Sequence, residues 1–352
     1  MKGDRRTYLK SIGTLGLAGL AGCMGSFGGG SGGAAANIGM VYAKGGLGDK
    51  SFNDMAQRGV KDAKEEYDIA FQERQPESDP DFKPAQRRFA ESTDPEYDLV
   101  CCIGFAQTKA LEANAKDYPD QNFMLVDSVV ESDNVANYVF KEHQGSFQVG
   151  YMAGLLTNQE FETSKAATKS GESKVGFVGG VEAPLIKKFE AGYKKGVEHA
   201  GNDVSVSSTY VGDFADPTGG KEAALSMYED GADIVYHAAG ATGLGVFQAA
   251  KEKGRYAIGV DADQSESEAD FKDYILASMV KRVDEAVLTA VGNVVDDNYK
   301  GGDVVTLGLD KNGVEAVYGQ TLGSEIPQGV KDKLKTSREE IIAGDISVPT
   351  EP

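Results

Sequence analysis

The sequence contains few of the residues that carry metal or nucleophilic chemistry. Among its 352 residues are three cysteines and three histidines, and the histidines are scattered, at His143, His199 and His237. Zinc sites need ligands at short, regular spacings, so no metal site is expected. Cys101 and Cys102 are adjacent in an apolar run, where neighbouring strand side chains point to opposite faces and a bond between them would be strained. We expect two buried thiols.

Motifs for nucleotide chemistry are also scarce. No Gly-x-x-x-x-Gly-Lys-Ser/Thr loop occurs, so nucleotide hydrolysis of the P-loop type is not expected. The segment 240–245, Gly-Ala-Thr-Gly-Leu-Gly, matches a dinucleotide fingerprint poorly, because its third glycine is misplaced and it does not follow the first strand. No nucleophile can be paired with a base in the predicted loops, where His237 is the single histidine near a candidate position. We therefore expect no enzyme activity and no cofactor.

Positive charge is in short supply. The chain has 36 lysines and arginines against 55 aspartates and glutamates, for a net charge of −19. Four basic side chains and one acidic one lie in residues 1–22, which leaves about −22 on the remainder. Such a surface repels the phosphates of nucleic acid and of anionic lipid, so neither is an expected partner. The acidic composition also resembles that of salt-adapted, halophilic proteins.

The apolar stretch near the N-terminus is too short to cross a membrane. Residues 12–22 follow Arg5-Arg6 and end in Leu-Ala-Gly before Cys23, whereas a spanning helix needs about 20 residues. Paired arginines before a short apolar stretch are typical of a twin-arginine export signal. We expect residues 1–22 to be a twin-arginine lipoprotein signal peptide, and residues 23–36 to be a lipidated cysteine followed by a flexible linker. The protein would then be exported and anchored by lipid to the outer face of the cell membrane; a fortuitous arginine pair and a spare cysteine are the alternative.

After the linker, apolar runs of strand length alternate with helical patterns. This alternation predicts an α/β protein with two doubly wound parallel sheets, since one hydrophobic core rarely serves so long a chain. We place a first lobe at residues 37–148 plus 267–300 and a second at 149–266 plus 301–345. The candidate strands are Ile38–Tyr42, Ile69–Gln72, Leu99–Ile103, Phe123–Val126, Val135–Phe140, Val175–Val178, Val204–Val211, Ile234–His237, Tyr256–Val260 and Ile275–Met279.

Polar and aromatic residues follow several of these strands, at the edge where ligands bind in such sheets. Phe52, beside Asn53, either stacks on a planar ligand or staples its helix to the sheet. Asp127 directly follows an apolar strand and is either a cleft carboxylate or a turn residue. Asp261 is placed to accept two hydroxyls, as a ribose diol offers. Lys281 is placed to pair with a carboxylate or to bind a ligand oxygen.

Six motifs in this order resemble the basic membrane protein family, which includes the purine-nucleoside receptor lipoproteins of ABC transporters. The resemblance extends over residues 37–322. The motifs are Gly48-Asp49-Lys50-Ser51-Phe52-Asn53, Phe177-Val178-Gly179-Gly180, Gly212-Asp213-Phe214-Ala215-Asp216-Pro217, Ala239-Gly240-Ala241-Thr242-Gly243, Ile258-Gly259-Val260-Asp261-Ala262-Asp263-Gln264 and Ser278-Met279-Val280-Lys281-Arg282.

The resemblance implies a type I periplasmic-binding-protein fold, with two lobes joined by three hinge crossings and a nucleoside enclosed between them. It implies that Phe52 and Phe214 clamp the base, while Asn53 and Asp127 bind the base edge. Phe189 is a rival for the second ring, although its position inside a predicted helix favours core packing.

On the ribose side, the resemblance implies that Asp261 binds the hydroxyls and that Lys281 and Gly240 complete the site. Asp49 lies in the first motif, either as a structural residue or as a residue that supports those in contact with the ligand. The chain departs from the family at Ala43-Lys44, where many members carry an acid. This departure bears on which base is preferred.

The resemblance further implies a non-catalytic, monomeric receptor that delivers a nucleoside to the permease and ATPase subunits of an ABC transporter. Two alternatives remain at this point. One is a ligand sensor or surface-binding protein of the same fold. The other is an exported nucleoside hydrolase that would use carboxylates such as Asp127 and Asp261.

Overall fold

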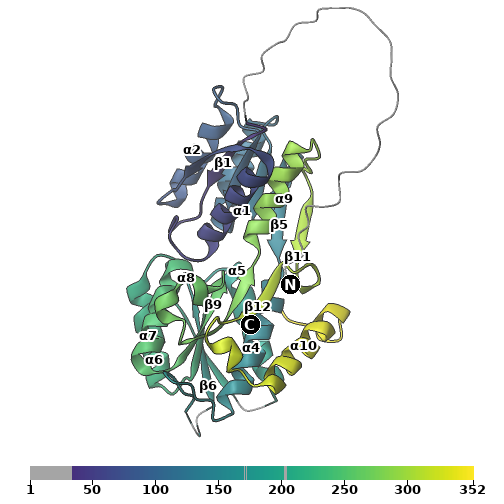
Figure 1. Ribbon diagram of the computed structural model, residues 1–352. Helices are drawn as coiled ribbons and strands as arrows, with labels where there is room; N and C mark the ends of the chain where they lie inside the picture. The colour runs from purple at the N-terminus through teal and green to yellow at the C-terminus, as the bar shows by residue number, and fades with distance from the viewer. Residues whose placement is uncertain (1–33, 170, 172, 202–203) are drawn as a thin grey trace, which may run out of the picture. The chain divides into compact units, whose positions relative to one another are not determined.

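The computed structural model describes residues 34–352, except residues 170, 172, 202 and 203. The predicted signal peptide, Cys23 and most of the predicted linker lie outside the described residues. The body forms two six-stranded sheets, each covered by helices on both faces (Figure 1). The prediction of an α/β protein with two doubly wound lobes is confirmed. No helix within the described residues is both long and apolar enough to span a bilayer.

The first sheet is wholly parallel, and we call it and its helices the first lobe. Its strands, in spatial order, are β11 (Val304–Leu307), β5 (Val135–Phe140), β4 (Phe123–Val126), β3 (Leu99–Ile103), β1 (Asn37–Val41) and β2 (Ala70–Arg74). Its helices are α1 (Phe52–Tyr67) and α9 (Val283–Val295) on one face, and α2 (Asp79–Ala90) and α3 (Thr108–Asp117) on the other.

The central strand β3 shows why both faces are covered. All five of its residues are buried, and Cys101 packs into the core under α1 and α9 whereas Cys102 packs into the core under α2 and α3. Both thiols are free and fully buried, as predicted. A strand that is apolar on both faces needs helices on both sides, which is the parallel doubly wound arrangement.

The second sheet, with its helices, forms the second lobe. Its strands are β12 (Val314–Tyr318), β10 (Ile275–Lys281), β9 (Tyr256–Asp261), β8 (Ile234–Ala238), β6 (Lys174–Gly179) and β7 (Ser205–Tyr210), and only the edge strand β12 is antiparallel. Its helices are α4 (Glu142–Thr157), α5 (Pro184–His199), α6 (Pro217–Glu229), α7 (Gly243–Lys253), the short α8 (Gln264–Ser267) and α10 (Gln328–Ala343).

Helices α4 and α5 pack unusually closely. A Cβ atom at Gly150 would lie 2.2 Å from the carbonyl oxygen of Tyr193, and one at Gly192 would lie 2.1 Å from that of His143. Only glycine allows the two backbones this approach. The pair forms one face of the second lobe and fixes α4 to the second sheet.

The chain passes between the lobes three times within the described residues. The crossings lie between Phe140 and Glu142, between Lys281 and Val283, and between Leu307 and Val314. The predicted boundaries were wrong at all three crossings, and they placed the start of α4 in the first lobe. They assigned β10 to the first lobe and β11 to the second, whereas strand pairing puts β10 beside β9 and β11 beside β5. The crossings occur where a strand runs straight into a helix, without the glycine- or proline-rich linker that would mark a boundary.

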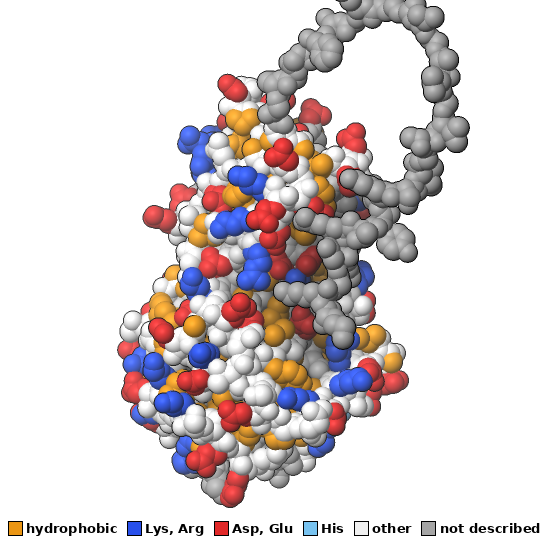
Figure 2. Space-filling model, in the orientation of Figure 1, with side chains coloured by type: hydrophobic (Ala, Val, Ile, Leu, Met, Phe, Trp, Pro, Cys, Tyr) orange, Lys and Arg blue, Asp and Glu red, His pale blue; other side chains and the backbone are white. Residues whose placement is uncertain are grey.

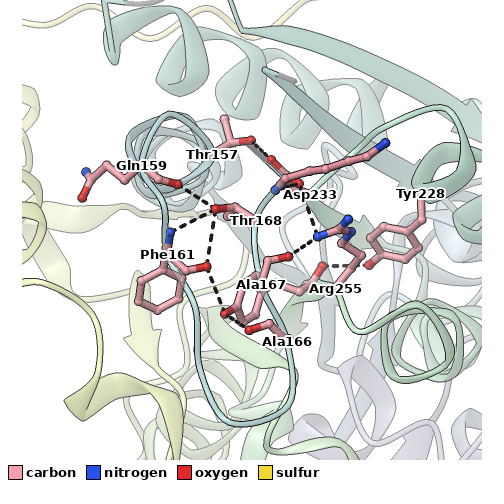
Figure 3. Close-up of polar contacts among 11 residues, drawn as sticks. Thr157, Gln159, Phe161, Ala166, Ala167, Thr168, Tyr228, Asp233 and Arg255 are labelled. Carbon is pink, nitrogen blue, oxygen red and sulfur yellow. Dashed lines mark hydrogen bonds and ion pairs between the residues drawn. The ribbon is translucent and has the colours of Figure 1, made fainter. Parts of the chain in front are cut away.

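A buried polar cluster joins the start of β8 to segment 158–169 and to Arg255 (Figure 3). Asp233 lies just before β8 and is fully buried, and it accepts hydrogen bonds from Thr157 Oγ1 at 2.5 Å and from the Lys169 backbone at 2.6 Å. Arg255 completes the cluster by donating to the carbonyl oxygen of Ala167. These bonds hold segment 158–169 against the sheet.

Candidate functional site

A cavity of about 210 Å³ opens between the two lobes at the carboxyl ends of their strands. All eight residues predicted to bind a ligand line it, four from each lobe. They are Asp49, Phe52, Asn53 and Asp127 from the first lobe and Phe214, Gly240, Asp261 and Lys281 from the second. Polar groups from distant parts of the chain therefore converge in one enclosed, mainly apolar space, as in small-molecule sites.

The loop before α1 is held by Asp49. Its carboxylate accepts backbone hydrogen bonds from Ser51 at 3.0 Å, Asn53 at 2.9 Å and Asp54 at 3.2 Å, so it satisfies free N–H groups at the start of the helix. Burial raises the pKa of Asp49 to about 6, against the lowering effect of these hydrogen bonds. Ser51, at the N-cap position of α1, makes no side-chain cap.

Asn53 is partly committed to its own lobe. Its Oδ1 accepts a hydrogen bond of 2.9 Å from the backbone of Ala43, in the segment where the chain departs from the family pattern. Its neighbour Lys44 lies 3.9 Å from Asp79 at the N-terminus of α2, and both side chains line the cavity. The carboxylate of Asp79, on α2, therefore lies near Lys44, where the loop lacks the acid that many family members carry.

The two predicted clamp rings come from opposite lobes. Phe52 and Phe214 are both half-buried and both line the cavity. Phe214 packs so closely on Gly180 that a Cβ there would lie 2.3 Å from its ring, and its carbonyl accepts a hydrogen bond of 3.0 Å from Thr242. Phe189 lines the cavity as well, but it is 2% exposed on α5 and belongs to the core, as its helical position predicted.

Lys281 and Asp127 form a buried ion pair across the lobes. Lys281 Nζ lies 2.6 Å from Asp127 Oδ2, and the ammonium also stands 4.6 Å from the centre of the Phe52 ring. Burial acts to lower the pKa of Lys281, but the charges of Asp127, Asp261 and Glu142 outweigh it and raise the pKa. Asp127 Oδ1 is buried and accepts no hydrogen bond within the described residues.

Asp261 forms a second link between the lobes. Its Oδ2 accepts a hydrogen bond of 2.6 Å from Ser51 Oγ. Nearby, the carbonyl of Lys50 accepts hydrogen bonds from Gln264 Nε2 at 3.2 Å and Ser267 Oγ at 3.3 Å. We call these five residues the clasp. Burial raises the pKa of Asp261, while Lys281 and Ser51 act to lower it.

Sequence reasoning missed Glu142 and the pairing of Ser51 with Asp261. Asp127 directly follows β4, and Glu142 follows β5 after one intervening residue, so a similar strand-end pattern was available as a signal. The partner of Ser51 lies 210 residues further along the chain. No local pattern indicates such a pairing.

His237 does not supply a catalytic base. It is fully buried beneath the cavity, where its Nε2 lies 2.9 Å from Gln264 Oε1, and burial lowers its pKa to about 4. Gln264 Nε2 donates to Lys50, so its Oε1 accepts from His237, which is neutral with Nε2 protonated. The described residues contain no group of three side chains suited to hold a metal ion.

Two α/β lobes joined by three crossings, with a ligand-sized cavity between them, define a solute-binding protein of the periplasmic type. A crystal structure of an ABC transporter solute-binding protein from Aeropyrum pernix matches with a TM-score of 0.79 and 30% identity, over 90% of this chain and 93% of that one. The chain belongs to the family of PnrA-like ABC transporter substrate-binding proteins, whose model matches residues 36–351. It is therefore a binding protein and not an enzyme.

Two relatives illustrate the family. A lipoprotein of Pyrococcus furiosus is 34% identical over 88% of this chain and 80% of its own length. A protein of Lactococcus lactis named ABC transporter nucleoside-binding protein BmpA is 31% identical over 87% of this chain and 86% of its own length. The resemblance identified from the six motifs is confirmed.

Proposed function

We propose that this protein binds a purine nucleoside between its lobes and delivers it to the permease of an ABC transporter. One observation carries the proposal. Two half-buried phenylalanine rings, one from each lobe, line the same cavity as the buried side chains of Asp127, Lys281 and Asp261. A nucleoside offers a flat base and a diol, and these require different surroundings. The name of the Lactococcus relative supports the same ligand class.

The base occupies the space between Phe52 and Phe214, where stacking on an aromatic face contributes about 1–3 kcal/mol. Asp127 Oδ1 has an unused acceptor there and accepts an N–H of the base edge. Asn53 assists at the same edge with its amide nitrogen, since its oxygen is bonded to Ala43. A base that presents N–H donors to this side is favoured.

The ribose occupies the other side of the cavity. Asp261 accepts from its hydroxyls, and Lys281 and the backbone of Gly240 complete the contacts. Asp49 keeps its position behind the ligand as the group that orders the first loop.

Charge supports an uncharged ligand. The cavity is lined by Asp49, Asp79, Asp127, Asp213 and Asp261 but by only two lysines, Lys44 and Lys281. Both lysines already face carboxylates. A nucleotide would bring its phosphate into a field of like charge, which costs binding energy.

The location belongs to the proposal too. Export through the twin-arginine signal in residues 1–22 and lipidation at Cys23 would hold the receptor at the outer face of the membrane. The name of the Pyrococcus relative, a lipoprotein, supports the lipid anchor. On the face drawn in Figure 2, acidic and basic side chains are interspersed over both lobes. A lipid anchor provides attachment that this mixed, net acidic surface does not.

A thermal-shift screen tests the ligand class. The full chain is heated in high salt with nucleosides, free bases, ribose, amino acids and nucleoside monophosphates. A ligand at 100 times its dissociation constant stabilises by about 2.7 kcal/mol, so the melting temperature rises by several degrees. We expect this rise with inosine, guanosine or adenosine and none with the corresponding monophosphates. If the melting temperature rose only with another class of ligand, the protein would remain a solute-binding protein but its proposed nucleoside ligand would be wrong.

A further inference from the structure

Glu142 is a buried acid that the ligand site does not use. It begins α4 immediately after the first crossing between the lobes, it is fully buried, and it does not line the cavity. Neither of its carboxylate oxygens has a hydrogen-bond partner within the described residues. Burying a carboxylate without hydrogen bonds costs folding free energy, so the presence of Glu142 here needs a physical explanation.

Two ammonium groups face this carboxylate. Lys281 Nζ lies 4.0 Å from Oε1, and Lys188 Nζ, on the partly exposed side of α5, lies 3.7 Å from Oε2. Burial raises the pKa of Glu142 to about 7; Lys281 and Lys188 act to lower it, and Asp127 acts to raise it. The cavity ion pair therefore continues into the hinge as a chain of alternating charges, from Asp127 through Lys281 and Glu142 to Lys188.

The members of this chain belong to different lobes. Asp127 follows β4 in the first lobe, whereas Lys281 ends β10 and Glu142 begins α4 in the second. Helix α4 packs on β10, so Glu142 and Lys281 stay together when the lobes move. Lobe separation breaks the bond between Lys281 and Asp127, together with the hydrogen bonds of the clasp.

We propose that Glu142 is a positioning residue that competes with Asp127 for the ammonium of Lys281 and so sets the equilibrium between open and closed lobes. In this structure the ammonium bonds to Asp127 at 2.6 Å and is 4.0 Å from Glu142, and because Ser51 and Asp261 also join the lobes we take it as the closed form. In the open form Glu142 keeps the ammonium paired on its own lobe. This lowers the cost of opening, because an isolated buried ammonium is strongly unfavourable.

The proposal rests on the lobe closure contained in the proposed function, but not on the identity of the ligand. Glu142→Gln keeps the shape and removes the charge, so in the open form Lys281 loses one of the carboxylates on its own lobe and keeps Asp261. We expect the closed-to-open ratio of the empty protein to rise at least about threefold, since modest electrostatic differences move a two-state equilibrium by such factors. Asp127→Asn removes the partner in the closed form and should lower the ratio.

Single-molecule energy transfer measures this ratio without ligand. Dyes are placed on cysteines introduced at Glu112 and Glu222, which are exposed on α3 and α6 in different lobes. The full chain carries Cys23→Ser, and the native Cys101 and Cys102 are buried and do not label. Glu339→Gln, an exposed change on α10, is the matched control and should leave the ratio unchanged.

A pH series on the unaltered protein gives a second test that does not depend on how the variant folds. The groups facing Glu142 are Lys281, Lys188, Asp127 and Tyr236, with His143 beside it on α4. Ionisation of Glu142 strengthens its hold on Lys281, so the closed fraction should fall as the pH rises through about 7, the pKa to which burial raises Glu142.

The outcomes separate the proposals. A higher closed fraction in Glu142→Gln, with a flat pH response, supports the positioning role. An unchanged or lower closed fraction, or an unaltered pH response in the variant, overturns it. Because the readout needs no ligand, a failure of nucleoside binding in the thermal-shift screen leaves this result intact, and the converse also holds.

Discussion

Ser51 Oγ, in the first lobe, donates a hydrogen bond of 2.6 Å to Asp261 Oδ2, in the second. Both residues are buried, and Asp261 also lines the cavity between the lobes. Asp261 therefore serves two purposes in the proposed function. One oxygen holds the lobes together, and the other remains for the ligand.

Ser51→Ala should weaken ligand binding although Ser51 is not among the proposed ligand contacts. A hydrogen bond to a charged group contributes about 1.5–3 kcal/mol, so we expect a roughly tenfold to hundredfold loss of affinity together with a smaller closed fraction. Helix α1 should persist, because Asp49 provides its cap. Calorimetric titration measures the affinity. Ser205→Ala, exposed on β7, is the control. Equal affinities in the two variants would mean that the bond from Ser51 to Asp261 does not contribute to ligand binding.

Phe52→Ala and Phe214→Ala should each reduce nucleoside affinity by more than tenfold and leave the fold intact. Each ring is half-buried at the cavity, so its loss removes a stacking surface worth about 1–3 kcal/mol and little core. Phe71→Ala, a half-buried ring on β2 away from the cavity, should bind normally. If Phe189→Ala alone abolished binding while Phe214→Ala had no effect, Phe189 would be the second clamp.

The stability of the protein should depend on Glu142 in a pH-specific way. Burial raises its pKa in the native state to about 7, above the ordinary value of 4.5, so between these values the native state binds more protons than the unfolded state. Its contribution to stability is therefore favourable at low pH and is lost as the pH rises through 7.

Comparison with Glu142→Gln isolates this contribution. His143 and His237, whose pKa values burial lowers to about 4, change stability in the opposite direction, but they do so in both proteins. The free energy of unfolding of the unaltered protein, relative to the variant, should decline from pH 4.5 to 7.5 in denaturant titrations. A constant difference would mean that Glu142 is ionised throughout.

Thr157→Val should destabilise the second lobe without touching the ligand site. Thr157 donates to the buried carboxylate of Asp233 at the end of the sheet opposite the cavity (Figure 3). Loss of that donor leaves one fewer bond to a buried charge, at a cost of about 1–3 kcal/mol. We expect a lower melting temperature and unchanged nucleoside affinity. A parallel loss of affinity would show that the two ends of the lobe are coupled.

Much of this arrangement follows from sequence pattern, for a physical reason. Strands such as β3 are apolar on both faces, and this pattern predicts a parallel sheet. Polar residues just beyond the carboxyl ends of such strands lie at the same edge of the sheet. For this reason the sequence alone predicted that Phe52, Asp127 and Asp261 lie in one site. The six ordered motifs added the family, which is confirmed, and the pairing of Phe52 with Phe214 across the ligand, which stays a prediction.

The crossings and the long-range pairs could not be predicted in this way. Lys281 ends a strand and Val283 begins a helix of the other lobe, with a single residue between them and no breaker. The edge strand β11 is partly exposed and only four residues long, which gives little periodicity. The bond between Lys281 and Asp127 spans 154 residues, and its existence depends on how the lobes pack.

Titration of inosine, guanosine and adenosine into the full chain, with Cys23→Ser to exclude lipid, tests the central claim most directly. The account predicts saturable one-to-one binding of at least one of them with a dissociation constant below about 1 μM, equivalent to about −8 kcal/mol. The same titration into Phe52→Ala should show the affinity reduced by more than tenfold. Absence of heat with all three nucleosides, in a protein that still unfolds cooperatively, would contradict the account.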